Sequence, residues 1–378
     1  MMSSTNYYQY KLISATNLII FLLLIPKINI INFEGYHQGI RIENLISLVL
    51  LFIILFNLKN FELNNGLKFY LFCSIIFLSY LVGSISNVTT LTVTILRLFE
   101  YLVFIVFFTN FKLDYKKIII FFKLLIIINF IVSILQYYEI LGFISSIGYI
   151  KSDFSLWRSA GIFSGSWELS FITSITYFII YHNDKKKINI YLFITLVILY
   201  LAGTRGILIP FIFSVLFLYI GNFKFRLIYA IIIPTIVSVL YFFITKYFGI
   251  SFITLANSII KLVFFSENIL QIDENLIAVY YSWAYRIENW VIFANIFNTN
   301  LFTVLFGSGY TSIYYESIFA RILFANGIIG LVILCILSLR IKFYMIIFLL
   351  LSGLTIDFVA SFKMFIILFL YFQCLKIR

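Results

Sequence analysis

The chain has 378 residues, of which 63% are hydrophobic and only 11% are charged. A soluble domain carries roughly 25% charged residues, so this composition excludes an ordinary water-soluble protein and predicts one membrane domain over residues 1–378. The formal net charge of +12 alone would suggest nucleic acid. The basic residues, however, stand in small groups between apolar runs, as in loops at a membrane face. We therefore expect a lipid bilayer, and no nucleic acid, as a partner.

The apolar runs predict an all-α, polytopic transmembrane bundle, since a spanning helix needs ~20 apolar residues. In chain order the twelve predicted spans are 12–31, 43–58, 67–85, 91–109, 118–141, 167–183, 188–203, 206–221, 227–247, 316–339, 343–357 and 362–375. Two connections, at about 142–166 and 248–315, are longer than a turn requires, and long ordered loops are usually functional. In the second, Ser282–Asn298 has helical spacing of tryptophan and phenylalanine, which predicts a helix lying at the membrane interface.

The basic residues also predict which side each loop occupies. With the N-terminus inside, 15 Lys and Arg residues fall at cytoplasmic ends and loops and 9 fall outside. This asymmetry predicts a multi-pass protein of a cytoplasmic membrane with both termini in the cytoplasm and the two long loops outside. The three cysteines and two histidines show no metal-binding spacing, so we expect no metal site and no cofactor.

Four arginines on the predicted outer side carry the possible chemistry: Arg158, Arg205, Arg286 and Arg321. An arginine at membrane depth costs ~2.5–3.5 kcal/mol on insertion scales, unless it reaches water or an anion. Its planar guanidinium suits phosphate, so several converging arginines would bind a pyrophosphate. Each also has a simpler interpretation. Arg205 could snorkel to the surface, Arg286 could lie on a solvated helix face, and Arg321 could pair with a nearby acid.

Few acidic residues accompany these arginines. Glu316 opens a predicted span on the outer side, where it is a candidate base, and Glu168 opens another. For both, the alternative is an acid favoured by the helix dipole, which is worth ~0.3–1 kcal/mol. Arg97 and Glu100 stand three apart within a span, and there we favour a structural ion pair over a substrate path.

Four segments, read in order, resemble the O-antigen polymerase and ligase superfamily. They are Arg158-Ser-Ala-Gly161 followed by SGSWELS, Gly203-Thr-Arg205-Gly206, the outer loop with Arg286 and Trp290, and Phe306–Tyr310 leading into Glu316 and Asn326–Gly330. The resemblance covers the chain from about residue 90. Ligases of this superfamily usually carry a histidine at the start of the late span, where this chain has Tyr315-Glu316-Ser317. That departure favours a Wzy-type polymerase.

The resemblance implies transfer of a glycan from one undecaprenyl-diphosphate carrier to another carrier-linked repeat unit, on the outer face of the bacterial inner membrane. The product would be an O-antigen or capsular polysaccharide, and a chain-length regulator protein is a further candidate partner. Arg205 and Arg286 would bind the diphosphate, Arg158 and Arg321 would contact the substrate, and Glu316 would act as base. A ligase and a flippase for lipid-linked oligosaccharide are the alternatives.

Overall fold

The computed structural model describes a large part of the chain. This part comprises residues 15–26, 29–32, 39–56, 92–111, 113–141, 158–184, 190–220, 301–307, 317–338, 342–357 and 361–376. Of the interpretable residues, 83% are helical, which confirms the all-α prediction. A helix over Ala15–Leu24 comes first. The labelled elements are then β1 (Asn29–Asn32), β2 (Gly39–Arg41), α2 (Ile42–Phe56), α4 (Thr92–Thr109), α5 (Tyr115–Tyr137), α6 (Ser166–Asp184), α7 (Ile190–Ala202), α8 (Arg205–Ile220), α12 (Leu301–Phe306), α13 (Ile318–Ser338), α14 (Phe343–Gly353) and α15 (Phe362–Lys376).

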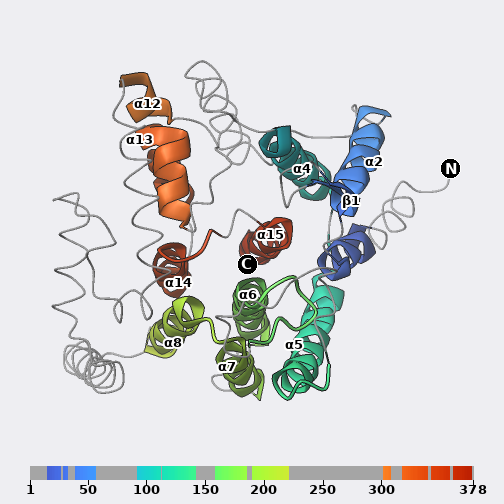
Figure 1. Cartoon of the computed structure of the whole chain (residues 1–378), viewed down its shortest axis with the longest axis vertical. Helices are drawn as coiled ribbons and strands as arrows, with labels where there is room; N and C mark the ends of the chain where they lie inside the picture. Colours follow the sequence, from blue (N-terminus) through green and yellow to red (C-terminus); the bar gives the residue numbers. More distant parts are fainter. Residues whose placement is uncertain are drawn as a thin grey trace.

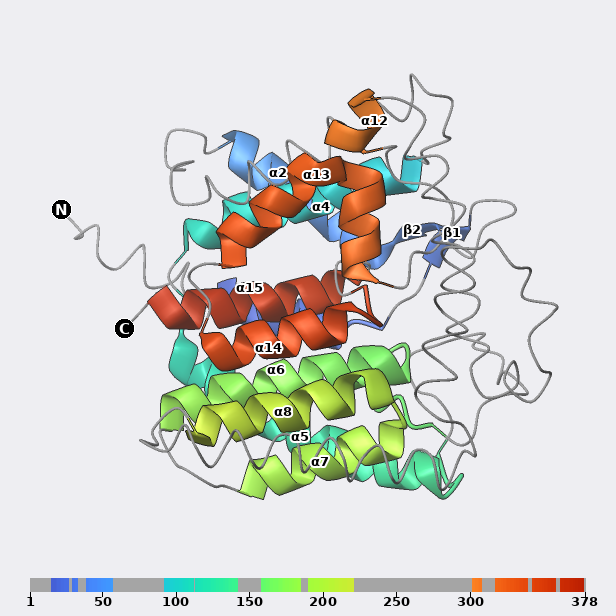
Figure 2. The same cartoon turned by 90° about the vertical axis from the view of Figure 1, so that its left-hand side faces the viewer.

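Most of these helices run along a common direction (Figure 2). Viewed end-on, α6 and α15 lie near the middle, with α5, α7, α8 and α14 beside them on one side and α2 and α4 on the other (Figure 1). The adjacent pairs include α8 with α14, α5 with α7, and α15 with α6. This arrangement is a helical bundle that contains both parallel neighbours, such as α6 with α15, and antiparallel neighbours, such as α8 with α14.

Helix α6 has buried side chains at every position from Glu168 to Ile180. Two of its serines tolerate this burial because they bond within the helix. Ser170 Oγ donates to the Ser166 carbonyl and Ser174 Oγ to the Ser170 carbonyl, both at 2.8 Å. Phenylalanine and tyrosine rings then fill the space between helices, as where Phe178 contacts Phe211 and Phe348 with centroids 5.4 and 5.5 Å away. Aromatic packing therefore holds α6 between α8 and α14.

The described helices match the predicted spans to within a few residues at most ends. In α5 the Asp114 side chain caps the helix by accepting from the Lys117 amide at 3.3 Å. The helix ends at Tyr137 instead of the predicted Leu141, because Glu139 takes a positive φ of 60° that a continuing helix cannot contain. The apolar run thus predicted the helix α5, while the backbone conformation of Glu139 determines where it ends.

By length and composition, α5 alone among the described helices is long enough and apolar enough to cross a membrane. The structure also describes shorter apolar helices of 10–17 residues, so the twelve-span count stays a prediction. The predicted spans 67–85 and 227–247 and the interfacial helix at Ser282–Asn298 lie outside the described residues. So do residues 142–157 and 248–300 of the two long outer loops.

Two described features were not predicted. The first is the antiparallel ribbon of β1 and β2, which pairs Ile31 with Ile40 next to α2. The second is a break in α13 at Gly327, whose φ of 68° and ψ of −169° are not helical. A chain of mostly apolar residues gives little periodic signal for either feature.

Candidate functional site

The predicted site residues that the structure describes lie at one end of the bundle. Helices α5, α7 and α14 end there, and α6, α8, α13 and α15 begin there (Figure 2). Polar contacts join the segments: the Ser159 amide donates to the Leu201 carbonyl at 3.1 Å, and Thr355 Oγ1 donates to the Gly206 carbonyl at 3.3 Å. We call this the arginine end, because it holds Arg158, Arg205 and Arg321.

Arg158 and the turn that carries Arg205 lie next to each other. Gly203 has a positive φ of 62° and closes the turn between α7 and α8, and Arg205 is the first residue of α8. A Cβ placed on Gly203 would be 3.2 Å from Cγ of Arg158, so the stem of Arg158 lies directly over this glycine. Both arginines are exposed. Two of the four segments that carry the resemblance therefore meet here.

The loop 158–165, which carries Arg158, is held by buried side chains. Gln136 Oε1 accepts from the amides of Ala160 and Gly161 at 2.9 and 2.8 Å. Asn129 Oδ1 accepts from the Ile162 amide at 3.1 Å. These bonds satisfy backbone groups that no helix or strand satisfies, so the loop is fixed in one conformation.

Glu168 joins this loop to α15. It is 1% exposed, and its Oε2 accepts from the Ser164 amide at 3.0 Å and from Ser164 Oγ at 2.6 Å. Its Oε1 accepts from Ser361 Oγ. Glu168 thus bonds the loop on one side and the segment before α15 on the other, which goes beyond the dipole role expected for a first-turn acid.

A buried lysine lies beside this network. Lys363 is 3% exposed, and its Nζ is 5.2 Å from the ring centroid of Phe163. The nitrogen has no hydrogen-bond partner among the described residues, while Glu168 and Glu43 act on it electrostatically. The ring and the two carboxylates lessen the cost of burying an ammonium group in an apolar core.

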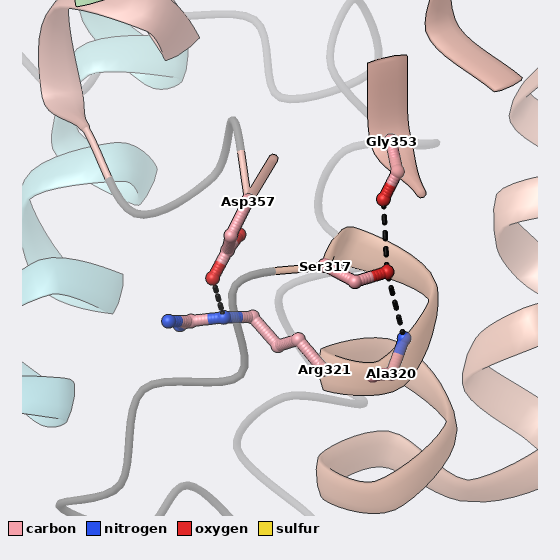
Figure 3. Close-up of polar contacts among 5 residues, drawn as sticks. All are labelled: Ser317, Ala320, Arg321, Gly353 and Asp357. Carbon is pink, nitrogen blue, oxygen red and sulfur yellow. Dashed lines mark hydrogen bonds and ion pairs between the residues drawn. The ribbon is translucent and has the colours of Figure 1, made fainter. Parts of the chain in front are cut away.

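Arg321, in the first turn of α13, forms an ion pair with Asp357 (Figure 3). The Asp357 side chain is fully buried, and that of Arg321 is 17% exposed. Nearby, Ser317 Oγ donates to the Gly353 carbonyl at 2.9 Å. The pairing with an acid that we gave as the simpler interpretation of Arg321 is therefore present, and it ties the start of α13 to the segment after α14.

Four residues singled out in the sequence are not among the described side chains. Glu316 and Arg286 lie outside the described residues, as does Trp290, and the side chain of Arg97 is likewise not described. Glu100 is fully buried and accepts a hydrogen bond from Asn44 Nδ2 of α2. The partner of Glu100 that the structure describes is thus an amide on another helix.

The chain matches no family model, no curated protein and no solved structure. The resemblance to the O-antigen polymerase and ligase superfamily accordingly stays an expectation that rests on the four segments. What the geometry adds is a bundle end where two exposed arginines stand on a fixed loop and a tight turn. Such an arrangement can bind an anionic group with little reorganisation, because the backbone that carries the cations is already held.

Several residues of this end were missed by sequence reasoning. Gln136 and Asn129 bind the loop, and Asp357 pairs with Arg321. A signal for the first two was available: amide side chains within an apolar helix are costly unless bonded, so each indicates a buried polar contact. Sequence alone could not name their partners, because these belong to a different segment.

Proposed function

We propose that the protein is a membrane enzyme that joins undecaprenyl-diphosphate-linked oligosaccharide repeat units on the outer face of the bacterial cytoplasmic membrane. The observation that carries the proposal is the juxtaposition of Arg158 with the Gly203–Arg205 turn at one end of the bundle. The reaction requires cations where a diphosphate leaves, since charge builds on it as the sugar–phosphate bond breaks.

Each arginine has a distinct role in this proposal. Arg205 and Arg286 bind the diphosphate with their planar guanidinium groups, and Arg158 supports them from the adjacent loop. Arg321, held through its Nε by Asp357, contacts the substrate from the start of α13. Glu316 takes the proton of the acceptor hydroxyl as the new glycosidic bond forms.

The side chains on the outward faces of the helices support a location in the lipid bilayer. Large apolar side chains are exposed along their length, including Phe56 (85%), Ile120 (60%), Phe193 (66%) and Val332 (51%). Water-soluble monomers rarely expose so many large apolar side chains, whereas a lipid bilayer would cover them favourably. The arginine end faces outward in this proposal, and the termini lie in the cytoplasm.

Deleting the gene and separating the surface glycan by size tests the class of function. A ladder that collapses to one repeat unit supports the polymerase. Loss of attached glycan with accumulation of lipid-linked polymer would indicate a ligase instead, and lipid-linked units retained on the cytoplasmic face would indicate a flippase.

Restoring the gene as Arg205→Ala tests the site. We expect normal membrane insertion but single repeat units, because the leaving diphosphate loses a principal cation; Arg205→Lys should stay impaired, since lysine lacks the planar fork. Lys342→Ala is the matched control, as Lys342 is an exposed cation before α14 at the opposite end of the bundle. Full-length chains from Arg205→Ala would contradict the proposed role.

A further inference from the structure

Three polar residues share one face of α5, an otherwise largely apolar helix. Asn129, Ser133 and Gln136 are spaced by four and three positions, which places them on adjacent turns. Their exposed fractions are 1%, 0% and 8%. We call these three residues the polar stripe of α5. A buried amide is costly unless it is hydrogen-bonded, so the hydrogen-bond partners of the two amides explain why they lie in the interior.

The two amides of the stripe bond the loop 158–165. Gln136 makes three bonds to it: Oε1 accepts from the amides of Ala160 and Gly161, and Nε2 donates to the Gly161 carbonyl at 3.0 Å. Asn129 accepts from Ile162 and anchors itself by donating to the Leu125 carbonyl at 2.9 Å. One helix face thus holds three successive residues of the loop.

These hydrogen bonds fix the segment that carries Arg158. Only Ser159 separates Arg158 from the held residues, and the Ser159 amide is bonded to the end of α7. A Cβ on Gly161 would collide with Oδ1 of Asn129, so the backbone itself lies against the stripe. The contact of Arg158 with Gly203 therefore depends on where α5 holds the loop.

We propose that Gln136 is a positioning residue that sets the place of Arg158 for binding a diphosphate. The inference rests on the proposed function and deepens it, since Gln136 does not contact substrate and acts through Arg158. A cation that is already in place loses less freedom when it binds an anion, so loosening the loop weakens binding without removing any charge.

The test is a double-mutant cycle on the purified full-length protein, with undecaprenyl diphosphate in detergent micelles as the probe. Gln136→Met keeps the volume and removes all three loop bonds. We expect Gln136→Met to weaken probe binding about five- to tenfold, and the double variant with Arg158→Ala to bind within about twofold of Arg158→Ala alone. Two outcomes would overturn the inference. One is an affinity loss in the double variant equal to the product of the two single losses, and the other is wild-type affinity in Gln136→Met.

Ser133→Ala is the matched control. Ser133 lies between the two amides on the same face, and its Oγ has no hydrogen-bond partner among the described residues. We expect Ser133→Ala to bind the probe like the wild type. An equal loss in this variant would show that any change in the stripe acts through packing, and the inference would fall.

Hydrogen exchange supplies a readout that needs no ligand. In Gln136→Met the amides of Ala160 and Gly161 should exchange faster, while those inside α6 keep their protection. If this variant does not fold, Asn129→Leu takes its place in the cycle, with the Ile162 amide as the reporter. Unchanged exchange at the loop would contradict the positioning role.

The cycle also separates the two proposals. If Arg158→Ala and Arg205→Ala both bind the probe as the wild type does, the proposed function fails and the inference fails with it. If both arginine variants bind weakly while Gln136→Met binds normally, the inference alone fails.

Discussion

At the scale of single residues, the arginine end depends on side chains that satisfy a loop backbone from outside it. Gln136, Asn129 and Glu168 each accept hydrogen bonds from backbone amides of the loop 158–165. These hydrogen bonds lie in the interior and stabilise the loop, because a buried donor left unpaired costs about 1–3 kcal/mol. The conformation of the loop is thus set by residues on α5 and α6.

Gly161 gives the sharpest residue-scale prediction. Its φ is 58°, and a Cβ there would collide with Asn129 Oδ1 and lie 2.8 Å from Leu169 Cδ1. We expect Gly161→Ala to lower the stability by about 1–2 kcal/mol from backbone strain alone, with the collision adding to this. Thermal unfolding in detergent measures the loss.

The control for that experiment is Gly165→Ala in the same loop. Gly165 has no positive φ, and its added Cβ would meet only the movable indole of Trp167, at 2.9 Å. A smaller loss is expected there. If the two variants unfold at the same temperature, the loop is not held in the conformation described.

Some residues of the arginine end could be recognised from the sequence because their own chemistry singles them out, whereas others depend on their partners. Arg158 and Arg205 could be singled out because a cation in an apolar chain is expensive wherever it lies. Gln136 indicates a buried polar contact because it is an amide within an apolar helix. Its partner, and the role of Asp357, could not be predicted, since both depend on a different segment. Arg321 shows the same limit: its alternatives were clear, but only the fold supplies Asp357 as its partner.

At the scale of elements, the apolar runs predicted most described helices because each run is bounded by charged or turn residues. The break in α13 escaped prediction, since Gly327 stands within a continuous apolar run. It is explained by α12: a Cβ on Gly327 would collide with the Leu305 carbonyl, and one on Gly307 with the backbone of Ala325. The two backbones approach so closely that only glycine fits at both places.

We therefore expect Gly327→Ala to loosen the joint between α12 and α13. The combination of φ 68° and ψ −169° is nearly exclusive to glycine, and forcing another residue into it costs about 1–3 kcal/mol. Faster hydrogen exchange in 301–307 would report the loss. Ile328→Ala, at a neighbouring position that is 44% exposed, should leave exchange in 301–307 unchanged; similar effects from both would contradict the explanation.

At the scale of the whole molecule, the bundle has two chemically different ends. The arginine end combines Arg158, Arg205 and Arg321 with fixed loops, while at the other end Lys123 pairs with Asp184 at 2.7 Å. Lys123 and Lys342 belong to the predicted cytoplasmic side, and the arginines to the outer side. The separation agrees with an enzyme that works on a lipid-linked substrate at one membrane face.

Transfer by the purified protein in lipid nanodiscs, with a synthetic undecaprenyl-diphosphate-linked repeat unit, tests the proposed polymerase activity directly. We predict that the wild-type protein forms a ladder of longer lipid-linked chains and releases one undecaprenyl diphosphate for each bond formed. Arg205→Ala should slow this by about a hundredfold or more, the usual loss when a principal transition-state contact is removed. Wild-type rates from Arg205→Ala, or no ladder from the wild-type protein, would contradict the account.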